Sequence, residues 1–261
     1  MVTTLPALKV MGKLEGKVAL ITGGGTGIGF ATAKLFVQEG AFVYITGRRL
    51  EVLKEAVQAI GGDRIQAIQA DIQKMEDIDK TYSEIKAKHE KLHILFANAG
   101  VGGFVPFENI SEEAFDTVFN TNVKGVFFSI QKALPMLPEG ASIVINSSAA
   151  NCHGCPGLTG YAATKAAVRS LARSLTSDLR DRKIRVNAIS PGPVDTPILG
   201  SPERAEAVKA SVVPVVPMGR VAHPDEIAKP VLFLASDDSS FITGVDLQVD
   251  GGLNVLPGRS R

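Results

Sequence analysis

A tyrosine and a lysine are spaced for proton chemistry at Tyr161 and Lys165. If this segment is helical, residues four positions apart lie on one face, a single turn from each other. A phenol with an ordinary pKa of about 10 exchanges protons poorly near neutral pH, whereas a nearby ammonium stabilises the phenolate and lowers that pKa. The pair therefore predicts an acid/base centre in which Tyr161 gives or takes the proton.

The same spacing occurs a second time, at Tyr82 and Lys86. That copy falls in a strongly charged stretch, and we expect its helix to be solvated. The Tyr161 copy instead begins a helix of small residues, shortly after an apolar run that ends at Ser147 and Ser148. A serine hydroxyl at such a strand end can hydrogen-bond a reacting oxygen, although serines also commonly cap or turn the chain. The context favours Tyr161, with Ser148 beside it.

A glycine-rich turn spans Thr22 to Gly29, between an apolar run and an amphipathic pattern. Strand, turn and helix thus come in the order that a dinucleotide-binding unit requires. Glycine lets the backbone approach a phosphate, and the next helix offers free N–H groups and the positive end of its dipole. Gly23, Gly27 and Gly29 form G-x-x-x-G-x-G, which is wider at its front than the usual G-x-G-x-x-G. We predict that a dinucleotide pyrophosphate binds here; a glycine turn without a ligand is the alternative.

Two arginines, Arg48 and Arg49, follow the expected second strand. An acidic residue at this place would hydrogen-bond the adenosine ribose and repel a 2′-phosphate. Guanidinium groups without a carboxylate favour the phosphate dianion, which they hold through charge-assisted, often bidentate, hydrogen bonds. The pair predicts NADP(H) rather than NAD. The alternative is that both arginines are solvated at the start of the next helix.

Short aliphatic or β-branched runs alternate with helical patterns along the chain. The runs that predict strands are 17–22, 42–46, 64–70, 92–97, 142–146, 184–189 and 245–249. Between them lie apolar stripes, one from Leu50 to Ile60 and another from Phe115 to Phe127. Near-continuous apolar strands joined by helices indicate an α/β class: a single-domain, doubly wound Rossmann fold with a seven-stranded parallel sheet and helices on both faces.

Three segments depart from this rhythm. Residues 1–13 show no strong period and are expected to form a flexible tail, which leaves 14–256 as the NADP-binding catalytic domain. Residues 257–261 are expected to be a disordered tail. Residues 197–219 are rich in proline and small side chains with one short helical patch, which predicts a lid over the substrate.

The composition excludes several classes of protein. A length of 261 residues suits one large α/β domain, and 45% hydrophobic residues are ordinary for a soluble globular protein. A net charge of +1 gives no reason to expect nucleic acid or a membrane as a partner. The chain has no apolar run of membrane-spanning length and no signal-peptide core, so we expect a cytoplasmic protein.

The cysteines and histidines do not predict a metal site. Cys152 and Cys155 form a Cys-x-x-Cys, but no second pair completes a zinc site and the surroundings are not thioredoxin-like, so any redox role stays open. His89 and His93 are four positions apart, yet His93 stands where a strand is expected to begin. We expect both to be surface histidines.

Together these motifs resemble those of the short-chain dehydrogenase/reductase family, of the classical kind, over nearly all of residues 14–252. The resemblance rests on the wide glycine pattern and on further motifs that follow in the family's order. These are Ala70-Asp71-Ile72, Asn98-Ala99-Gly100, Asn122-Val123-Lys124-Gly125, Ser148 ahead of Tyr161 and Lys165, Pro191-Gly192 with Thr196, and Val249-Asp250-Gly251-Gly252. Two departures are visible: Ala97 replaces the usual first asparagine, and Thr26 stands where some NADP-using members carry a basic residue.

The resemblance implies a catalytic tetrad of Asn122, Ser148, Tyr161 and Lys165. Lys165 would also hold the nicotinamide ribose, and Asn122 would orient a water that links Lys165 to solvent. The implied cofactor site comprises Gly23, Gly25, Thr26, Gly27, Ile28, Arg48, Arg49, Asp71, Ile72, Asn98, Ala99, Gly100, Tyr161, Lys165, Pro191, Gly192, Val194 and Thr196. A homotetramer packed through the helices that bear Asn122 and Tyr161 is implied as well.

The expected activity is NADP(H)-dependent reduction of a ketone, aldehyde or 3-oxoacyl group to an alcohol. An alcohol or sugar dehydrogenase working in the oxidative direction would use the same residues, and a non-catalytic nucleotide-binding regulator would use the same fold. The expected pocket walls are Val101 to Phe107, Ala149 to Gly160 and 197–219, with Cys152 and His153 facing inward. Their small or apolar side chains favour an uncharged, partly apolar small molecule.

Overall fold

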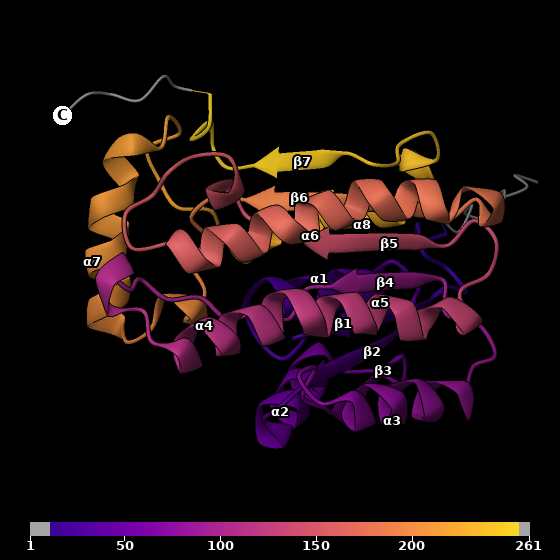
Figure 1. Ribbon diagram of the computed structural model, residues 1–261. Helices are drawn as coiled ribbons and strands as arrows, with labels where there is room; N and C mark the ends of the chain where they lie inside the picture. The colour runs from indigo at the N-terminus through magenta and orange to yellow at the C-terminus, as the bar shows by residue number, and fades with distance from the viewer. Residues whose placement is uncertain (1–10, 256–261) are drawn as a thin grey trace, which may run out of the picture.

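The computed structural model describes residues 11–255 and builds them around one sheet of seven strands (Figure 1). The strands are β1 (Val18–Thr22), β2 (Phe42–Gly47), β3 (Ile65–Gln69), β4 (Ile94–Ala97), β5 (Ser142–Asn146), β6 (Arg185–Pro191) and β7 (Asp246–Val249). Every pairing is parallel, in the order β3-β2-β1-β4-β5-β6-β7. The predicted doubly wound sheet is confirmed, and each strand end lies within two residues of its expected position.

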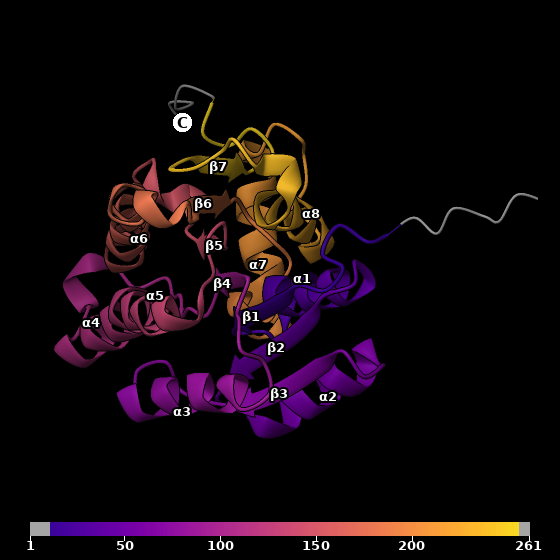
Figure 2. The same cartoon turned by 90° about the vertical axis from the view of Figure 1, so that its right-hand side faces the viewer.

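Two layers of helices cover the sheet, as the end-on view shows (Figure 2). Helices α1 (Gly27–Gln38), α2 (Leu50–Ile60) and α8 (Pro224–Ala235) pack on one face. Helices α3 (Met75–Lys86), α4 (Glu112–Phe119), α5 (Val126–Ala133) and α6 (Thr159–Asp178) lie on the other. The strands are apolar on both faces, so each layer closes a core of its own.

The strand order places a topological switch between β1 and β4. The chain runs outward from β1 to β3 and then returns to the other side of β1, so the connections after β1 and β4 diverge. In sheets of this kind ligands bind in the gap at the carboxyl ends of the strands. The glycine-rich turn follows β1 and Asn98 follows β4, which brings both to this gap.

Contacts with the folded domain are present at residues 13 and 14. The backbone N–H of Lys13 donates to the Glu39 carboxylate at 2.8 Å, and Leu14 is completely buried. Within the described chain, residue 13 therefore contacts the folded unit, at the boundary that the sequence predicts between tail and domain. Residues 1–10 of that tail, together with residue 256 and the predicted tail 257–261, lie outside the described residues.

The segment 197–219 holds more helix than the single short patch predicted. Helix α7 (Pro202–Val212) runs between two short 3₁₀ turns, Pro197–Leu199 and Val213–Val215. Its start has clear local signals, because the Ser201 side chain accepts a hydrogen bond from the Arg204 N–H and proline occupies the first turn. In Figure 1 this helix lies beyond the carboxyl ends of the strands, across the switch point.

The predicted stripe from Phe115 to Phe127 does not face the core as a unit. A π-helical turn, Asn120–Gly125, joins α4 to α5. The wider turn breaks the 3.6-residue period, so side chains on its two sides lose their common phase. Val126 is buried, whereas Phe115 is 45% exposed and Phe127 is 42% exposed.

None of the helices within residues 11–255 is both long enough and apolar enough to cross a membrane.

Candidate active site

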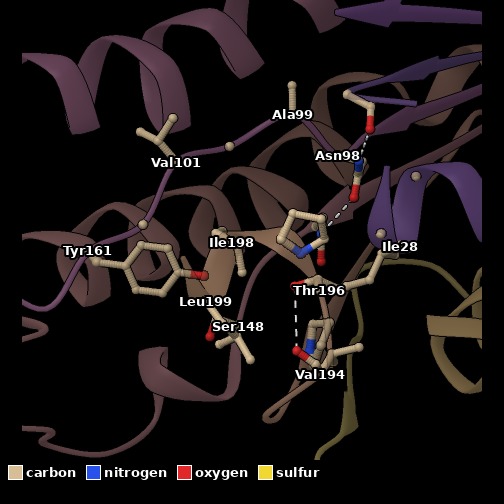
Figure 3. Close-up of a pocket in the computed structure, with 18 of the residues that line it drawn as sticks. Ile28, Asn98, Ala99, Val101, Ser148, Tyr161, Val194, Thr196, Ile198 and Leu199 are labelled. Carbon is tan, nitrogen blue, oxygen red and sulfur yellow. Dashed lines mark hydrogen bonds between the residues drawn. The ribbon is translucent and has the colours of Figure 1, made fainter. Parts of the chain in front are cut away.

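A cavity of about 600 Å³ opens at the carboxyl ends of the strands, where the switch point was expected to bind ligands. Its walls join the glycine-rich turn to the helix that bears Tyr161, and Figure 3 shows Ile28, Asn98, Tyr161 and Thr196 around the same space. The lining includes every residue predicted for the site except Asn122. Motifs scattered over the whole chain thus meet at one place.

The glycine cradle leaves no room for side chains. Gly27 has a φ of +55°, which L side chains rarely adopt, and a Cβ at Gly29 would lie 2.2 Å from the carbonyl oxygen of Gly23. The N-cap residue Thr26 makes no side-chain cap, and the first turn of α1 contains no acidic residue. Bare N–H groups at a positive helix end, without a competing anion, fit a pyrophosphate. The residues present therefore suit the dinucleotide that the sequence predicts.

Arg48 and Arg49 line the cavity at its β2 side. Both are exposed, and neither makes an ion pair within residues 11–255. Asp71 and Ile72 line the same end from the turn after β3. Asp71 cannot repel a phosphate as strongly as an acid at the end of β2 would, because it belongs to the next loop and its Oδ1 accepts a hydrogen bond from the Gln73 N–H at 3.0 Å.

The Asn98 side chain makes its hydrogen bonds to other residues of the protein. Its Nδ2 donates to the carbonyl oxygens of Thr22 (2.9 Å) and Gly23 (3.1 Å). Its Oδ1 accepts from Nδ2 of Asn146 at 2.9 Å. Asn98 lines the cavity as predicted, and it also holds the glycine turn against β4. Sequence reasoning did not find Asn146, because an asparagine at the end of a strand carries no spacing signal of its own.

Tyr161 and Lys165 occupy the first turns of α6. Ser148 stands in the turn after β5, and Figure 3 shows it close to the Tyr161 hydroxyl. The Lys165 Nζ lies 5.6 Å from the centroid of the Tyr161 ring and donates to the carbonyl oxygen of Asn146 at 2.8 Å. Only 4% of Lys165 is exposed. The arrangement puts a phenol, an ammonium and a hydroxyl around one end of the cavity.

Burial governs the pKa of both titratable groups in the protein without a ligand. It lowers the pKa of Lys165 to about 8. It also raises the pKa of Tyr161, and the neighbouring Ser148 hydroxyl offsets part of that rise. The pKa of Tyr161 in the protein alone is therefore raised rather than lowered as the spacing predicted, because burial takes the phenolate out of water.

Asn122 lies behind the cavity wall, in the π-helical turn between α4 and α5. Its Oδ1 accepts from the N–H of Val101 at 2.8 Å, and its Nδ2 donates to the Val101 carbonyl at 2.8 Å and to Thr164 Oγ1 at 3.1 Å. One amide hydrogen bond thus fixes the loop after β4, and the other connects Asn122 to α6. A Cβ on Gly100 would stand 3.2 Å from Asn122 Oδ1 and 3.5 Å from Lys165 Nζ, so a side chain at this position would crowd the Asn122 amide.

The remaining wall of the cavity differs in part from expectation. Phe104, His153 and Cys155 line it, whereas Cys152 and Phe107 do not. The segment 197–219 lines it through Pro197, Ile198, Leu199, Arg204, Val208, Val212 and Val215. Sequence reasoning gave no role to Arg204, since one arginine in an exposed helix carries no distinctive pattern.

Cys152 and Cys155 are free thiols rather than a disulfide. Within the described part of the chain no group of three or more histidine, cysteine or carboxylate side chains is placed to hold a metal. His89 and His93 are half-buried rather than surface residues, which corrects the prediction. The His89 ring hydrogen-bonds the Tyr44 hydroxyl at 2.8 Å, and His93 Nδ1, one residue before β4, accepts from the Val18 N–H at 3.0 Å.

The chain is similar to known oxidoreductases along most of its length. A family model described as enoyl-(acyl carrier protein) reductase matches residues 23–254. Oxidoreductase asL5 of Sarocladium schorii is 44% identical over 243 residues, which cover 92% of this chain and 97% of that protein. The NADP-dependent (R)-specific alcohol dehydrogenase of Lentilactobacillus kefiri is 37% identical over 246 residues, which cover 92% of this chain and 97% of that enzyme.

A solved structure agrees with these relatives in fold. The 3-ketoacyl-(acyl-carrier-protein) reductase from Brucella melitensis, complexed with NADH, superposes with a TM-score of 0.87 at 36% identity, covering 92% of this chain and 99% of that one. The matches agree with the parallel sheet, the glycine cradle and the Tyr161 cavity described above. The chain therefore belongs to the classical short-chain dehydrogenase/reductase family of oxidoreductases.

Proposed function

We propose that this protein is an NADP(H)-dependent reductase that converts a ketone, aldehyde or 3-oxoacyl group into an alcohol. One observation carries the proposal: Ser148, Tyr161 and Lys165 meet at one end of the cavity whose other end is the glycine cradle. A substrate carbonyl beside Tyr161 is then within reach of a cofactor held by the cradle. The bound nicotinamide would supply the hydride.

The protein's own groups handle the oxygen and its proton. Tyr161 donates its phenolic proton to the substrate oxygen during reduction, and Ser148 donates a hydrogen bond to the same oxygen as negative charge develops there. Lys165 is charged below its pKa of about 8. In its charged form Lys165 would stabilise the phenolate that forms when Tyr161 donates its proton. The same ammonium would hold the nicotinamide ribose. Asn122 would hold the loop after β4 in place. It would also orient the water that links Lys165 to solvent and so returns the donated proton.

The remaining predicted residues would hold the rest of the dinucleotide. The cradle would take the pyrophosphate, Asp71 and Ile72 the adenine, and Asn98 to Gly100 the ribose side, with the loop from Pro191 to Thr196 at the nicotinamide. Arg48 and Arg49 favour NADP over NAD, because two unpaired guanidinium groups in the cavity wall match a 2′-phosphate. The NADP-dependent relative agrees with this choice, whereas the Brucella structure holds NADH.

The walls near Tyr161 favour an uncharged, partly apolar substrate. Leu158, Ile198, Leu199 and Phe104 are apolar, and the segment 197–219 would act as a lid because it supplies part of the cavity wall. The relatives named as an alcohol dehydrogenase and a ketoacyl reductase differ in the substrate and direction that their names give. Oxidation of an alcohol or sugar is therefore the second candidate, and it uses the same residues.

We further propose a cytoplasmic homotetramer without nucleic-acid or membrane partners. Phe115 on α4 and Phe127 on α5 leave apolar surface on the helices that flank Asn122, where a second copy would cover it. Sedimentation equilibrium of the wild type and of a Phe115→Glu/Phe127→Glu variant measures this. We expect a tetramer for the wild type and smaller species for the variant; a wild-type monomer contradicts the proposal.

An absorbance screen of nicotinamide oxidation tests the activity across ketones, aldehydes, quinones, sugars and oxoacyl thioesters, with NADPH and NADH compared at each. We expect a carbonyl substrate with a higher kcat/KM for NADPH, and we expect the Arg48→Ala/Arg49→Ala variant to lose that preference by about tenfold or more. A wild-type preference for NADH contradicts the cofactor assignment. Turnover of no substrate in either direction would favour the non-catalytic regulator.

A further inference from the structure

The groups proposed to act on the substrate stand on two separate elements. Ser148 belongs to the turn after β5, whereas Tyr161 and Lys165 belong to α6. The chain between them, residues 152–158, is a loop without a helix or strand, and much of it is exposed. Proton donation and oxyanion stabilisation need Ser148 and Tyr161 to be held in one geometry to within about 0.5 Å. The loop alone cannot supply such a constraint.

Asn151 bridges these two elements directly. Its Nδ2 donates to the carbonyl oxygen of Ser148 at 2.5 Å, within the 3₁₀ turn that Ser148 caps. Its Oδ1 accepts from Nη1 of Arg169 at 3.0 Å. Arg169 stands on α6 four residues after Lys165, which itself stands four after Tyr161, so all three lie on one stripe of that helix. The amide therefore connects the Ser148 turn to the stripe that carries the phenol.

The orientation of this amide is fixed by its partners. Arg169 can only donate and a backbone carbonyl can only accept, so Oδ1 must face Arg169 and Nδ2 must face Ser148. The same Nδ2 also lies 3.1 Å from Ser147 Oγ and 2.9 Å from Ser190 Oγ. Ser147 in turn donates to the carbonyl oxygen of Lys165 at 2.9 Å. Asn151 thus contacts the backbone of Ser148 directly. It also contacts Ser147, whose hydroxyl holds the backbone of Lys165.

An ion pair between a half-exposed arginine, Arg169, and a buried carboxylate lies at the outer side of this cluster. The Asp246 side chain on β7 is 9% exposed and lies 2.9 Å from Nε of Arg169. Its other oxygen accepts from Ser190 Oγ at 2.5 Å. The carboxylate thus holds Ser190 through a hydrogen bond and Arg169 through its charge, since Nε of Arg169 makes no hydrogen bond to it among the described residues. The cluster runs without a break from the edge strand β7 to the turn that presents Ser148.

We propose that Asn151 is a positioning residue that sets the place of Ser148 relative to Tyr161 and acts on the reaction through Ser148 alone. The inference rests on the proposed function, in which Ser148 holds the reacting oxygen. Asn151 does not line the cavity, so a role in contacting the substrate is not assigned to it. Its effect is expected in turnover rather than in cofactor binding.

A double-mutant cycle with Asn151→Asp and Ser148→Ala tests this. Asn151→Asp keeps the shape of the side chain but replaces the donor that faces the Ser148 carbonyl with an acceptor. We expect its kcat to fall about 10- to 100-fold, the size of effect that a misplacement near 1 Å produces, with the Kd for NADPH within about twofold of the wild type. Ser148→Ala should lower kcat by about 10²- to 10³-fold.

The decisive comparison is the effect of Asn151→Asp in the Ser148→Ala background. If Asn151 acts through Ser148, the double variant has the kcat of Ser148→Ala, within about twofold. Asn151→Ala, which removes the amide without adding charge, should behave in the same way and serves if the aspartate variant does not fold. Asn109→Asp, at an exposed asparagine outside the cavity wall, is the matched control and should leave kcat unchanged.

The remaining outcomes overturn the inference. They are an unchanged kcat per folded molecule in the Asn151 variants, or losses that multiply with that of Ser148→Ala. Wild-type turnover by Ser148→Ala would instead contradict the proposed function itself, so the two failures are told apart by the single variants.

Discussion

Tyr82 and Tyr161 each stand one helical turn before a lysine, but the two pairs lie in opposite surroundings. The Tyr82 ring is 7% exposed in the core between α3 and α5, and its hydroxyl donates to the Ser129 carbonyl at 2.5 Å. Its partner Lys86 is exposed. At the other pair the lysine is buried and the phenol lines a cavity. The spacing of a tyrosine and a lysine therefore does not by itself identify an acid/base pair. The fold determines which of the two side chains is buried and which faces solvent.

Burial acts on the two phenols in the same direction and with different consequences. Desolvation raises the pKa of Tyr82 and of Tyr161. Only at Tyr161 do a hydroxyl, an ammonium and an accessible cavity surround the phenol. Only there can a bound ligand and a nearby charge stabilise the phenolate in place of the water that burial removes. Tyr82 is a structural residue, and the prediction that its helix is solvated holds for Lys86 but is wrong for the tyrosine.

The largest expected difference between the pairs is in turnover. Tyr161→Phe should lower kcat for carbonyl reduction by about 10²- to 10⁴-fold, because it removes the proton donor, and should leave NADPH binding intact. Tyr82→Phe should leave kcat within about twofold of the wild type. Steady-state kinetics and NADPH fluorescence titration on both variants measure this. Full activity in Tyr161→Phe would falsify the acid/base assignment.

A second contrast separates the lysines by cofactor affinity and its pH dependence. Because the pKa of Lys165 is lowered to about 8, its positive charge is present below that pH and lost above it. We expect kcat/KM for NADPH to decline above pH 8 by about tenfold, and expect Lys165→Arg, which stays charged, to flatten the decline even if its overall rate is lower. Lys86→Arg should reproduce the wild-type profile. If kcat/KM declines above pH 8 in Lys165→Arg as it does in the wild type, the titration of another group causes the decline and the assignment to Lys165 is contradicted.

The same lysines should differ in how stability responds to pH. The folded protein releases the Lys165 proton near pH 8, whereas the unfolded chain holds it to its ordinary pKa of 10.5. The unfolded state therefore binds more protons between these values, and the free energy of unfolding rises with pH through that window. Lys165→Met should remove this rise, on the order of 1–3 kcal/mol, while Lys86→Met should retain it. Urea unfolding at the two ends of the window gives the comparison.

The smallest expected effect concerns the core tyrosine. Tyr82→Phe removes one buried hydrogen bond to the Ser129 carbonyl and should lower the free energy of unfolding by about 1 kcal/mol. Tyr161→Phe breaks no buried backbone contact and should change it by less than about 0.5 kcal/mol. Denaturant unfolding of both variants measures the difference. A larger loss of unfolding free energy in Tyr161→Phe than in Tyr82→Phe would contradict this prediction.

Sequence patterns predicted the parts of this molecule that depend on local order. Apolar runs and glycine spacing predicted the sheet and the cradle at Gly23 to Gly29, because strand, turn and helix must follow one another directly. The motif residues also met at the cavity as expected, with Asn122 behind its wall. Helix α7 was underestimated although Ser201 and Pro202 signal its start, because small and charged side chains give it no apolar stripe.

Properties that depend on burial were not predictable in this way. The directions of the pKa shifts at Tyr161 and Lys165 follow from what covers these groups, which a spacing of four residues does not contain. The exposure of Phe115 and Phe127 follows from a π-helical turn that no periodicity announces. Asn151 contacts Arg169, Ser190 and the Ser148 turn only because two strands, β5 and β6, and helix α6 bring them together.

A crystal structure of the NADPH complex with a carbonyl substrate or inert analogue tests the contrast between the two pairs most directly. We predict that the Tyr161 hydroxyl lies at hydrogen-bond distance, about 2.6–3.2 Å, from the ligand oxygen. We also predict that Lys165 Nζ faces the nicotinamide ribose while Lys86 remains in solvent. A Tyr161 hydroxyl remote from the ligand oxygen, or a Lys165 side chain turned into bulk water, would contradict the account.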